Sequence, residues 1–173
     1  DGATDSAPTE FAGQDLSNSS FIDIDFQGED MTEVNLSGSD LTKSFFGSAT
    51  MTAANLSQAN LTETGFSFAD LSGADISGAT LADANFSVAI LSNENLADVK
   101  GAGSNFRKAQ LDGASLVGAD FAGAKFADAV LTGADLTNVD FTNANLFYAD
   151  LTGANLTGAI LTGANITGAI IPE

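Results

Sequence analysis

Residues 151–169 read LTGANLTGAILTGANITGA, with a large apolar residue at every fifth position. The same spacing extends from Phe11 to Ile171, where Leu, Phe, Met or Ile occupies 32 of 33 positions and Gly101 is the exception. A longer period of 20 residues relates Phe26, Phe46, Phe66, Phe86, Phe106 and Phe126. Helices repeat every 3.6 residues and strands every two, so neither produces this pattern. The period therefore indicates a solenoid whose chain returns to the same place after 20 residues.

The residues around each apolar position, which we call the centre, indicate how five residues form one side of a coil. The residue two before the centre is usually Ala, and the residue just before it is usually Asp or Asn. Alternate residues of an extended segment point to opposite faces, so Ala and the centre point inward and the polar residue outward. The Ser/Thr–Gly pair that often follows supplies a turn, because Gly tolerates unusual backbone angles.

Four such sides per 20 residues predict an all-β, four-sided parallel solenoid of about eight coils, roughly 39 Å long at the spacing of paired strands. In this arrangement like residues stack on like. We therefore expect the rings of Phe66, Phe86 and Phe106 to lie one above another.

The chain resembles the pentapeptide repeat proteins, whose family pattern is A(D/N)LXX. The segments ADLSG (69–73), ANLSQ (54–58), ADLTG (149–153) and ANLTG (154–158) match this pattern literally, and the resemblance covers residues 11–171. It implies a right-handed, four-sided (quadrilateral) β-helix. The matching positions are the structural ones, so the resemblance is specific for fold and says little about function.

The 173 residues fit one domain over residues 11–171. Residues 1–10 lack the periodicity, and we expect a tail or a short cap there. With 23 acidic and five basic residues, the formal net charge is −18, which argues against direct nucleic-acid binding. No apolar run is long enough for membrane insertion, and the absence of Cys excludes disulfides. The polar segment after Asp1 favours export, to a periplasm or a thylakoid lumen, with a cytoplasmic protein as the alternative.

The residue types argue against catalysis. The chain contains no His and no Cys, and most Asp residues stand just before a centre, where the repeat itself places them. An Asp in this position is expected to bond to the turn or to solvent. We therefore predict no catalytic, cofactor-binding or metal-binding residues, and no enzyme.

The pattern is irregular near residues 94–108. Glu94 takes an inward position and Gly101 takes a centre, while Lys100, Arg107 and Lys108 lie close by. One interpretation is a local bulge or loop, with Glu94 turned outward or paired with a lysine. The other is a recognition patch.

The side that carries the phenylalanine column differs from the other three in its outward residues. Among acids it holds only Asp25 and Asp128, whereas most other carboxylates belong to the other three sides. Exposed aromatic residues in a charge-depleted area are typical of protein-binding surfaces, although these residues could instead cover corners or a cap. The candidate interaction face consists of Phe45, Phe68, Arg107, Lys108, Lys125, Phe147 and Tyr148.

Solenoid ends expose core and unpaired edges unless they are covered. Ile160, Ile170 and Ile171 lie near the C-terminal end of the repeats and are candidates for an end-to-end contact in a homodimer. Such dimers are also known in the pentapeptide repeat family.

The leading functional interpretation is a non-catalytic interaction or scaffold protein, bacterial or cyanobacterial, with an unknown protein partner. The alternative, which the resemblance suggests, is an acidic DNA mimic that binds DNA gyrase or topoisomerase and protects it from quinolones. A third hypothesis is ice binding, because Thr32, Thr52, Thr132 and Thr152 share one outward column with less regular neighbours.

Overall fold

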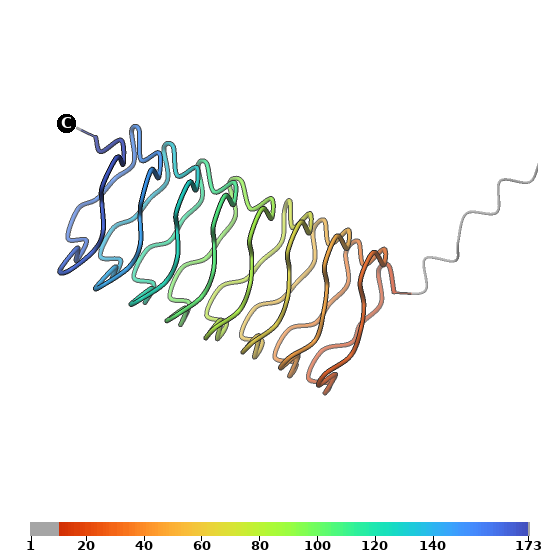
Figure 1. The fold of residues 1–173 in the computed structure, drawn as a ribbon. Coiled ribbons are helices and arrows are strands. Elements are labelled where there is room, and N and C mark those ends of the chain that lie inside the picture. The colour runs from red at the N-terminus through yellow and green to blue at the C-terminus, as the bar shows by residue number, and fades with distance from the viewer. Residues whose placement is uncertain (1–10, 173) are drawn as a thin grey trace, which may run out of the picture.

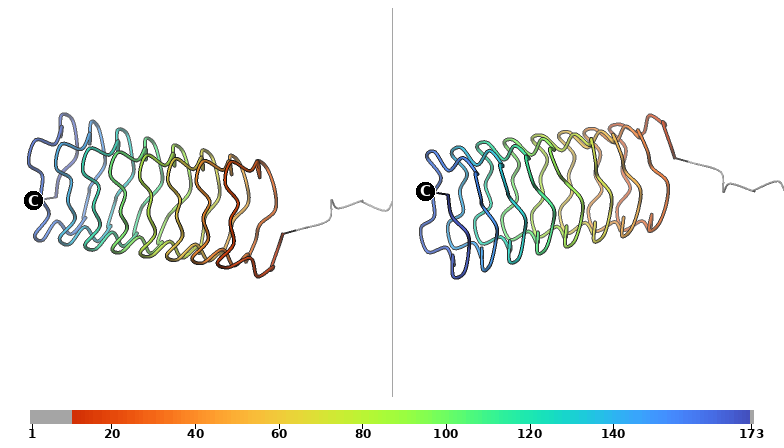
Figure 2. Two further views of the ribbon diagram at one scale, coloured as in Figure 1. Left: turned by 90° about the horizontal axis from the view of Figure 1, so that it is seen from below. Right: turned by 90° about the horizontal axis from the view of Figure 1, so that it is seen from above.

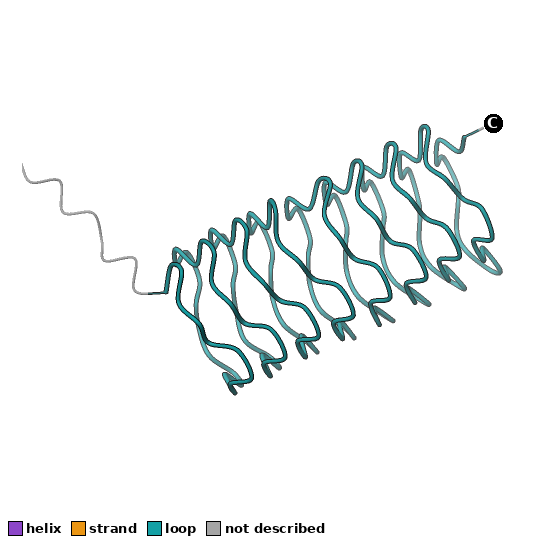
Figure 3. Ribbon diagram, turned by 180° about the vertical axis from the view of Figure 1, so that it is seen from behind, coloured by secondary structure: helices purple, strands orange, loops and turns teal. Residues whose placement is uncertain are grey.

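The described chain is a stack of similar coils around one axis. The computed structural model describes residues 11–172, and the chain advances along the stack from one end to the other (Figures 1 and 2). Parallel bridges join each residue before a centre to the residue 20 positions later, from Asp15–Asn35 to Asp150–Ile170. Between residues 11 and 172 there is no helix, and the only β-structure is these isolated bridges (Figure 3). The tail or cap expected at residues 1–10 lies outside the described residues.

No helix in the described part of the chain has the length and apolar character needed to cross a membrane.

The hydrogen bonds of one repeat explain the sequence pattern. In residues 136–140, the amides of the first and third residues donate to the following coil, the fifth donates to the preceding coil, and the fourth closes the turn onto the first. The amide that remains, that of Thr137, donates to Oδ1 of Asp135 at 3.0 Å. Asn165 receives the amide of Thr167 in the same way at 3.2 Å. Where Asp or Asn precedes the centre, its side chain therefore completes the backbone hydrogen bonding of its repeat.

Each side ends at a corner residue, two positions after the centre. Its φ is positive at all 32 corners from Gly13 to Gly168, of which 14 are Gly and 18 are other residues. The predicted Gly turns are thus confirmed where Gly is present. The coil imposes the same conformation where it is absent, at an expected cost of about 1 kcal/mol per L-residue.

The core consists of centres and small residues that fill the interior of the coils. Every centre from Phe26 to Leu151 is buried, and the phenylalanine column is a continuous ring stack. The ring centroids of Phe66 and Phe86 are 4.8 Å apart, and those of Phe86 and Phe106 are 4.9 Å apart, with interplanar angles of 9° and 2°. The predicted stacking of these three rings is confirmed.

Gly101 does not interrupt the solenoid, because a ring from the next coil fills its place. A Cβ at residue 101 would lie 2.4 Å from Cε1 of Phe121. The Phe121 ring packs edge-to-face against Phe106 and Phe126, at centroid distances of 5.3 and 5.1 Å. The missing side chain of one coil is therefore replaced by a larger one from its neighbour.

Glu94 also differs from the expected bulge or lysine pair. Turns and bridges continue through residues 94–108, and Glu94 is buried with 6% of its surface exposed. Its carboxylate accepts a hydrogen bond from the Gly73 amide. Among the described residues, the regular bonds from the Gly73 amide to Ser92 and from the Asn95 amide to Ala74 are both missing. The irregularity is thus confined to the bonds between two coils.

Burial raises the pKa of the Glu94 carboxyl. The hydrogen bond from Gly73 opposes this shift, and the negative charge of Asp70 adds to it. The carboxylate is therefore less favourable here than in solvent, and the repeat loses regular hydrogen bonds to accommodate it.

Candidate functional site

One side of the rod has corners unlike those of the other three. Corner residues elsewhere are Gly or polar residues, with Ala53 as an exception, but this side places Phe68, Val88 and Tyr148 at positive φ. Such a conformation is unfavourable for aromatic and β-branched residues. Phe68 and Tyr148 nevertheless remain 65% and 60% exposed, so burial compensates for little of this strain. We call this side, which carries the phenylalanine column inside, the aromatic face.

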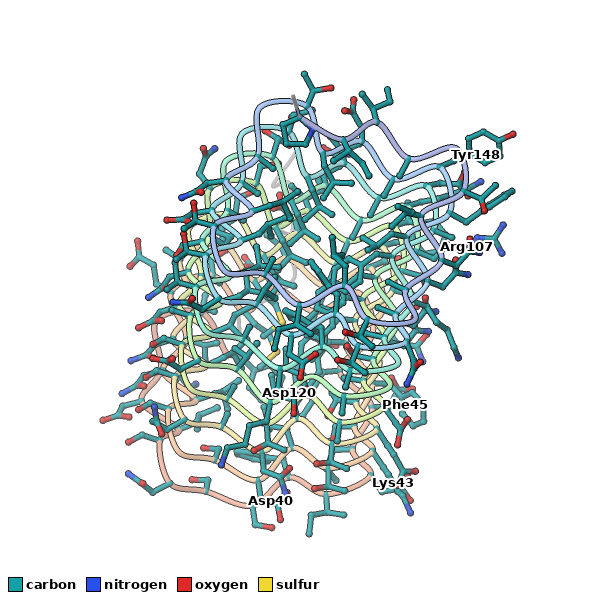
Figure 4. All side chains as sticks on the ribbon, turned by 90° about the vertical axis from the view of Figure 1, so that its left-hand side faces the viewer. Asp40, Lys43, Phe45, Arg107, Asp120 and Tyr148 are labelled. Carbon is teal, nitrogen blue, oxygen red and sulfur yellow. The ribbon has the colours of Figure 1, made fainter. Side chains whose placement is uncertain are left out.

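The aromatic face contains the sequence-predicted interaction residues. Phe45 and Phe147 add rings that are 44% and 38% exposed, and the Phe147 and Tyr148 rings meet edge-to-face with centroids 4.3 Å apart. In Figure 4, Phe45, Arg107 and Tyr148 project from the same side of the rod, and Asp40 and Asp120 lie on a neighbouring side. Lys108 and Lys125 stand at a corner and a bridge position of this face and are exposed. Of the predicted set, Phe45 and Phe68 lie in coils far from those of Phe147 and Tyr148.

Two hollows lie along the aromatic face. The first hollow is lined by Phe45, Gly47, Gly65 and Ser67, and Glu63 reaches it from the adjacent corner. The depression exists because Gly47 and Gly65 carry no side chains beside the Phe45 ring. Sequence reasoning missed these residues, although small residues next to exposed aromatics are a signal that could have indicated them.

The second hollow is lined by Arg107, Lys125, Ala127, Asp128 and Phe147. Ala127 lies at the bottom of this hollow, because its short side chain stands between the longer side chains of Arg107 and Phe147 in the coils on either side. Arg107 Nε lies 3.7 Å from Asp128 Oδ2, and both side chains remain partly exposed, so this ion pair contributes little to stability. The arrangement combines cations, side-chain amides and one aromatic ring.

Most acidic residues outside the aromatic face have a structural explanation. Asp135, Asp140 and Asp150 each accept the amide of the threonine two residues later. The threonine side chain, and then its amide, lowers the pKa of each of these carboxyls. Within residues 11–172, no three Asp or Glu residues are grouped so that they could hold a metal ion.

The isoleucines proposed for an end-to-end contact occupy two kinds of position. Ile160 and Ile170 take the outward bridge positions opposite Asp140 and Asp150, so they lie on the sides of the last described coil. Ile171 is a centre and is 41% exposed, as is Ile166, which sequence reasoning did not select.

The comparison with family models now identifies the repeat. The model described as "Pentapeptide repeats" matches eight copies, over residues 9–47, 30–67, 46–78, 79–116, 114–147 and 140–171. The chain belongs to the pentapeptide repeat family. The match indicates no enzyme family. No curated protein matches the chain at a significant level.

Solved pentapeptide repeat structures are similar to this chain. HetL, a protein involved in heterocyst differentiation regulation from the cyanobacterium Nostoc sp. strain PCC 7120, is 28% identical, with a TM-score of 0.51 over 92% of this chain and 77% of HetL. The plasmid-mediated fluoroquinolone resistance protein QnrB1 is 23% identical, with a TM-score of 0.49 over 93% of this chain and 85% of QnrB1. A pentapeptide repeat protein from the Arabidopsis thaliana thylakoid lumen is 29% identical, with a TM-score of 0.27 over 75% and 70% of the chains.

Proposed function

We propose that this pentapeptide repeat protein is a non-catalytic scaffold whose aromatic face binds a protein partner. We also infer that its coils wind right-handed, as the family resemblance implies. From the 20-residue period we infer that they number about eight. The observation that carries the functional proposal is the placement of Phe68 and Tyr148. Both take a backbone conformation that disfavours aromatic residues and keep most of their surface exposed, although the Tyr148 ring also packs against Phe147.

The proposal is tested by capture of partners from an extract of the source organism. A variant with Phe68, Phe147 and Tyr148 replaced by Ser should lose the captured protein while keeping the circular-dichroism spectrum of the native chain. A matched control replaces Asn93, Asp98 and Asn138, which are also corner residues but lie away from the aromatic face. Undiminished capture by the aromatic variant would refute the proposal.

The DNA-mimic alternative rests on the formal charge of −18. Duplex DNA carries one charge per roughly 1.7 Å, so a rod of about 39 Å would need roughly 23 charges. Most acids lie on the three other sides, and many bond to their own turns, as for Asp135 and Asp140, which favours a structural origin for them. Inhibition of gyrase supercoiling by the purified chain would favour the mimic over the scaffold.

Ice binding is less well supported by the threonine column. Thr52 donates to Thr32 at 3.3 Å, but farther along the column Ser92 donates to Asp112 at 2.6 Å. These hydroxyls are engaged within the chain and their spacing is chemically irregular. A thermal-hysteresis measurement tests this hypothesis directly.

We further propose a homodimer through the last described coil, where Ile166 and Ile171 expose apolar surface. Replacing both with Glu should lower the mass measured by light scattering from that of a dimer to that of a monomer. A native chain that is already monomeric at high concentration would contradict this proposal.

A further inference from the structure

The charge distribution restricts which partner the aromatic face can take. Arg107 is paired with Asp128, but Lys108 and Lys125 have no ion pair within the described residues. At the first hollow, Glu63 is paired with Lys43 at 3.8 Å. The second hollow therefore keeps uncompensated positive charge in a molecule whose formal net charge is −18.

This local excess favours an acidic ligand at one place. The three other sides carry most of the carboxylates and repel acidic segments, whereas a basic partner would be attracted to those sides instead. The charge distribution therefore favours the second hollow, which Arg107 and Lys125 line, over the other three sides as the place where an acidic segment binds.

The first hollow offers complementary chemistry at a defined distance. Its Gly47 and Gly65 leave space beside the exposed Phe45 ring, which suits an apolar side chain. The first hollow lies between the coils of Phe46 and Phe66, and the second is centred near that of Phe126, so they are three to four ring-stacking steps of 4.8–5.0 Å apart. This separation of roughly 17 Å corresponds to about five residues of extended chain.

We propose that the aromatic face binds an extended segment of a partner protein, with an apolar residue in the first hollow and an acidic residue about five positions away in the second hollow. This inference rests on the proposed function of the face. It specifies the chemistry of the two anchor residues of the partner segment and their spacing along the rod.

The test uses the full chain, nuclear magnetic resonance and two peptides. The peptide LSSSDE carries the apolar and acidic residues at the proposed spacing, and LSSSKK is its charge-reversed control. LSSSDE should produce saturable shifts of the amides of Ser67 and Ala127, whereas LSSSKK should not. Because the contact is partly ionic, raising the salt concentration to 0.5 M should weaken binding severalfold.

A charge-reversed chain sharpens the test. Arg107→Glu together with Lys125→Glu should weaken LSSSDE binding at least tenfold and should allow LSSSKK to bind. Lys100→Glu is the matched control, because Lys100 also takes an exposed bridge position but on another side. Absence of saturable shifts, or equal losses in the control and the charge-reversed chain, would overturn the inference.

The two proposals fail in different ways. If the charge-reversed chain still captures the cellular partner while the aromatic-to-Ser variant does not, the interaction face stands and the acidic-segment inference is refuted. If neither variant changes capture, the proposed function itself is refuted.

Discussion

The packing of Phe121 into the space of the missing residue 101 side chain gives a quantitative prediction. A Cβ at residue 101 would lie 2.4 and 2.6 Å from two ring carbons of Phe121, well inside van der Waals contact. Gly101→Leu alone should therefore cost about 3 kcal/mol of unfolding free energy through overpacking. Gly101 has no positive φ, so backbone strain adds nothing to this cost.

Phe121→Leu alone should cost about 2 kcal/mol, because the ring atoms that fill the space of residue 101 are lost and a cavity remains. The double variant restores the Leu column of Leu41, Leu61 and Leu81, which are fully buried. Its stability should lie within about 1 kcal/mol of the native chain, so the coupling energy should have a magnitude of about 4–6 kcal/mol, above the usual range for contacting residues.

The assay is equilibrium unfolding in urea, followed by circular dichroism, for the four chains of the double-mutant cycle. Phe141→Leu serves as control, because Phe141 lies in the same column on the far side of Phe121 and its truncation creates no space at residue 101. Additive effects of Gly101→Leu and Phe121→Leu would refute the account of how the chain tolerates Gly101.

Three further predictions concern single positions. Glu94→Ala should stabilise the chain at neutral pH by about 1–2 kcal/mol, because two regular hydrogen bonds can form again. Folding raises the pKa of Glu94, so the buried carboxylate destabilises the fold above its folded pKa and has no such effect below its unfolded pKa. The stability advantage of Glu94→Ala, measured by urea unfolding, should therefore shrink as pH falls. An advantage that stays constant with pH would contradict this prediction. Gly133→Ala should lower the unfolding free energy by about 1 kcal/mol through its φ of 65° alone, since an added Cβ meets nothing within 4 Å; an unchanged urea midpoint would contradict it. The hydrogen bonds to Asp135 lower its pKa, so they stabilise the fold above the unfolded value of 3.8, and this contribution is lost as pH falls through the lower folded pKa. Asp135→Asn should keep the turn and remove this pH dependence from acid-unfolding curves, whereas Asp135→Ala should destabilise at neutral pH.

The repeat made the fold and several details predictable. The stacking of Phe66, Phe86 and Phe106 follows from their 20-residue spacing, because identical coils place identical positions above one another. The side assignment of Phe68 and Tyr148 follows from the same register. These inferences need only the period, and the period is continuous from residue 11 to residue 171.

The exceptions to the repeat could not be resolved in this way. Gly101 and Glu94 break the pattern, and their outcomes depend on residues about 20 positions away, Phe121 and Gly73, that lie in adjacent coils. The hollows of the aromatic face likewise form where a small residue of one coil lies beside an aromatic ring of a neighbouring coil. A pattern along one coil contains no information on these contacts.

The sequence by itself determined the solenoid, the inward and outward positions and the aromatic character of one side, because each depends on a regular spacing. Only the tertiary structure decided that Phe121 fills the place of residue 101, that Glu94 is buried against Gly73, and that two hollows lie along the aromatic face. The physical reason is that packing and desolvation depend on the distances between side chains of different coils. A periodic pattern fixes which residues lie above one another, but it does not fix how their side chains pack.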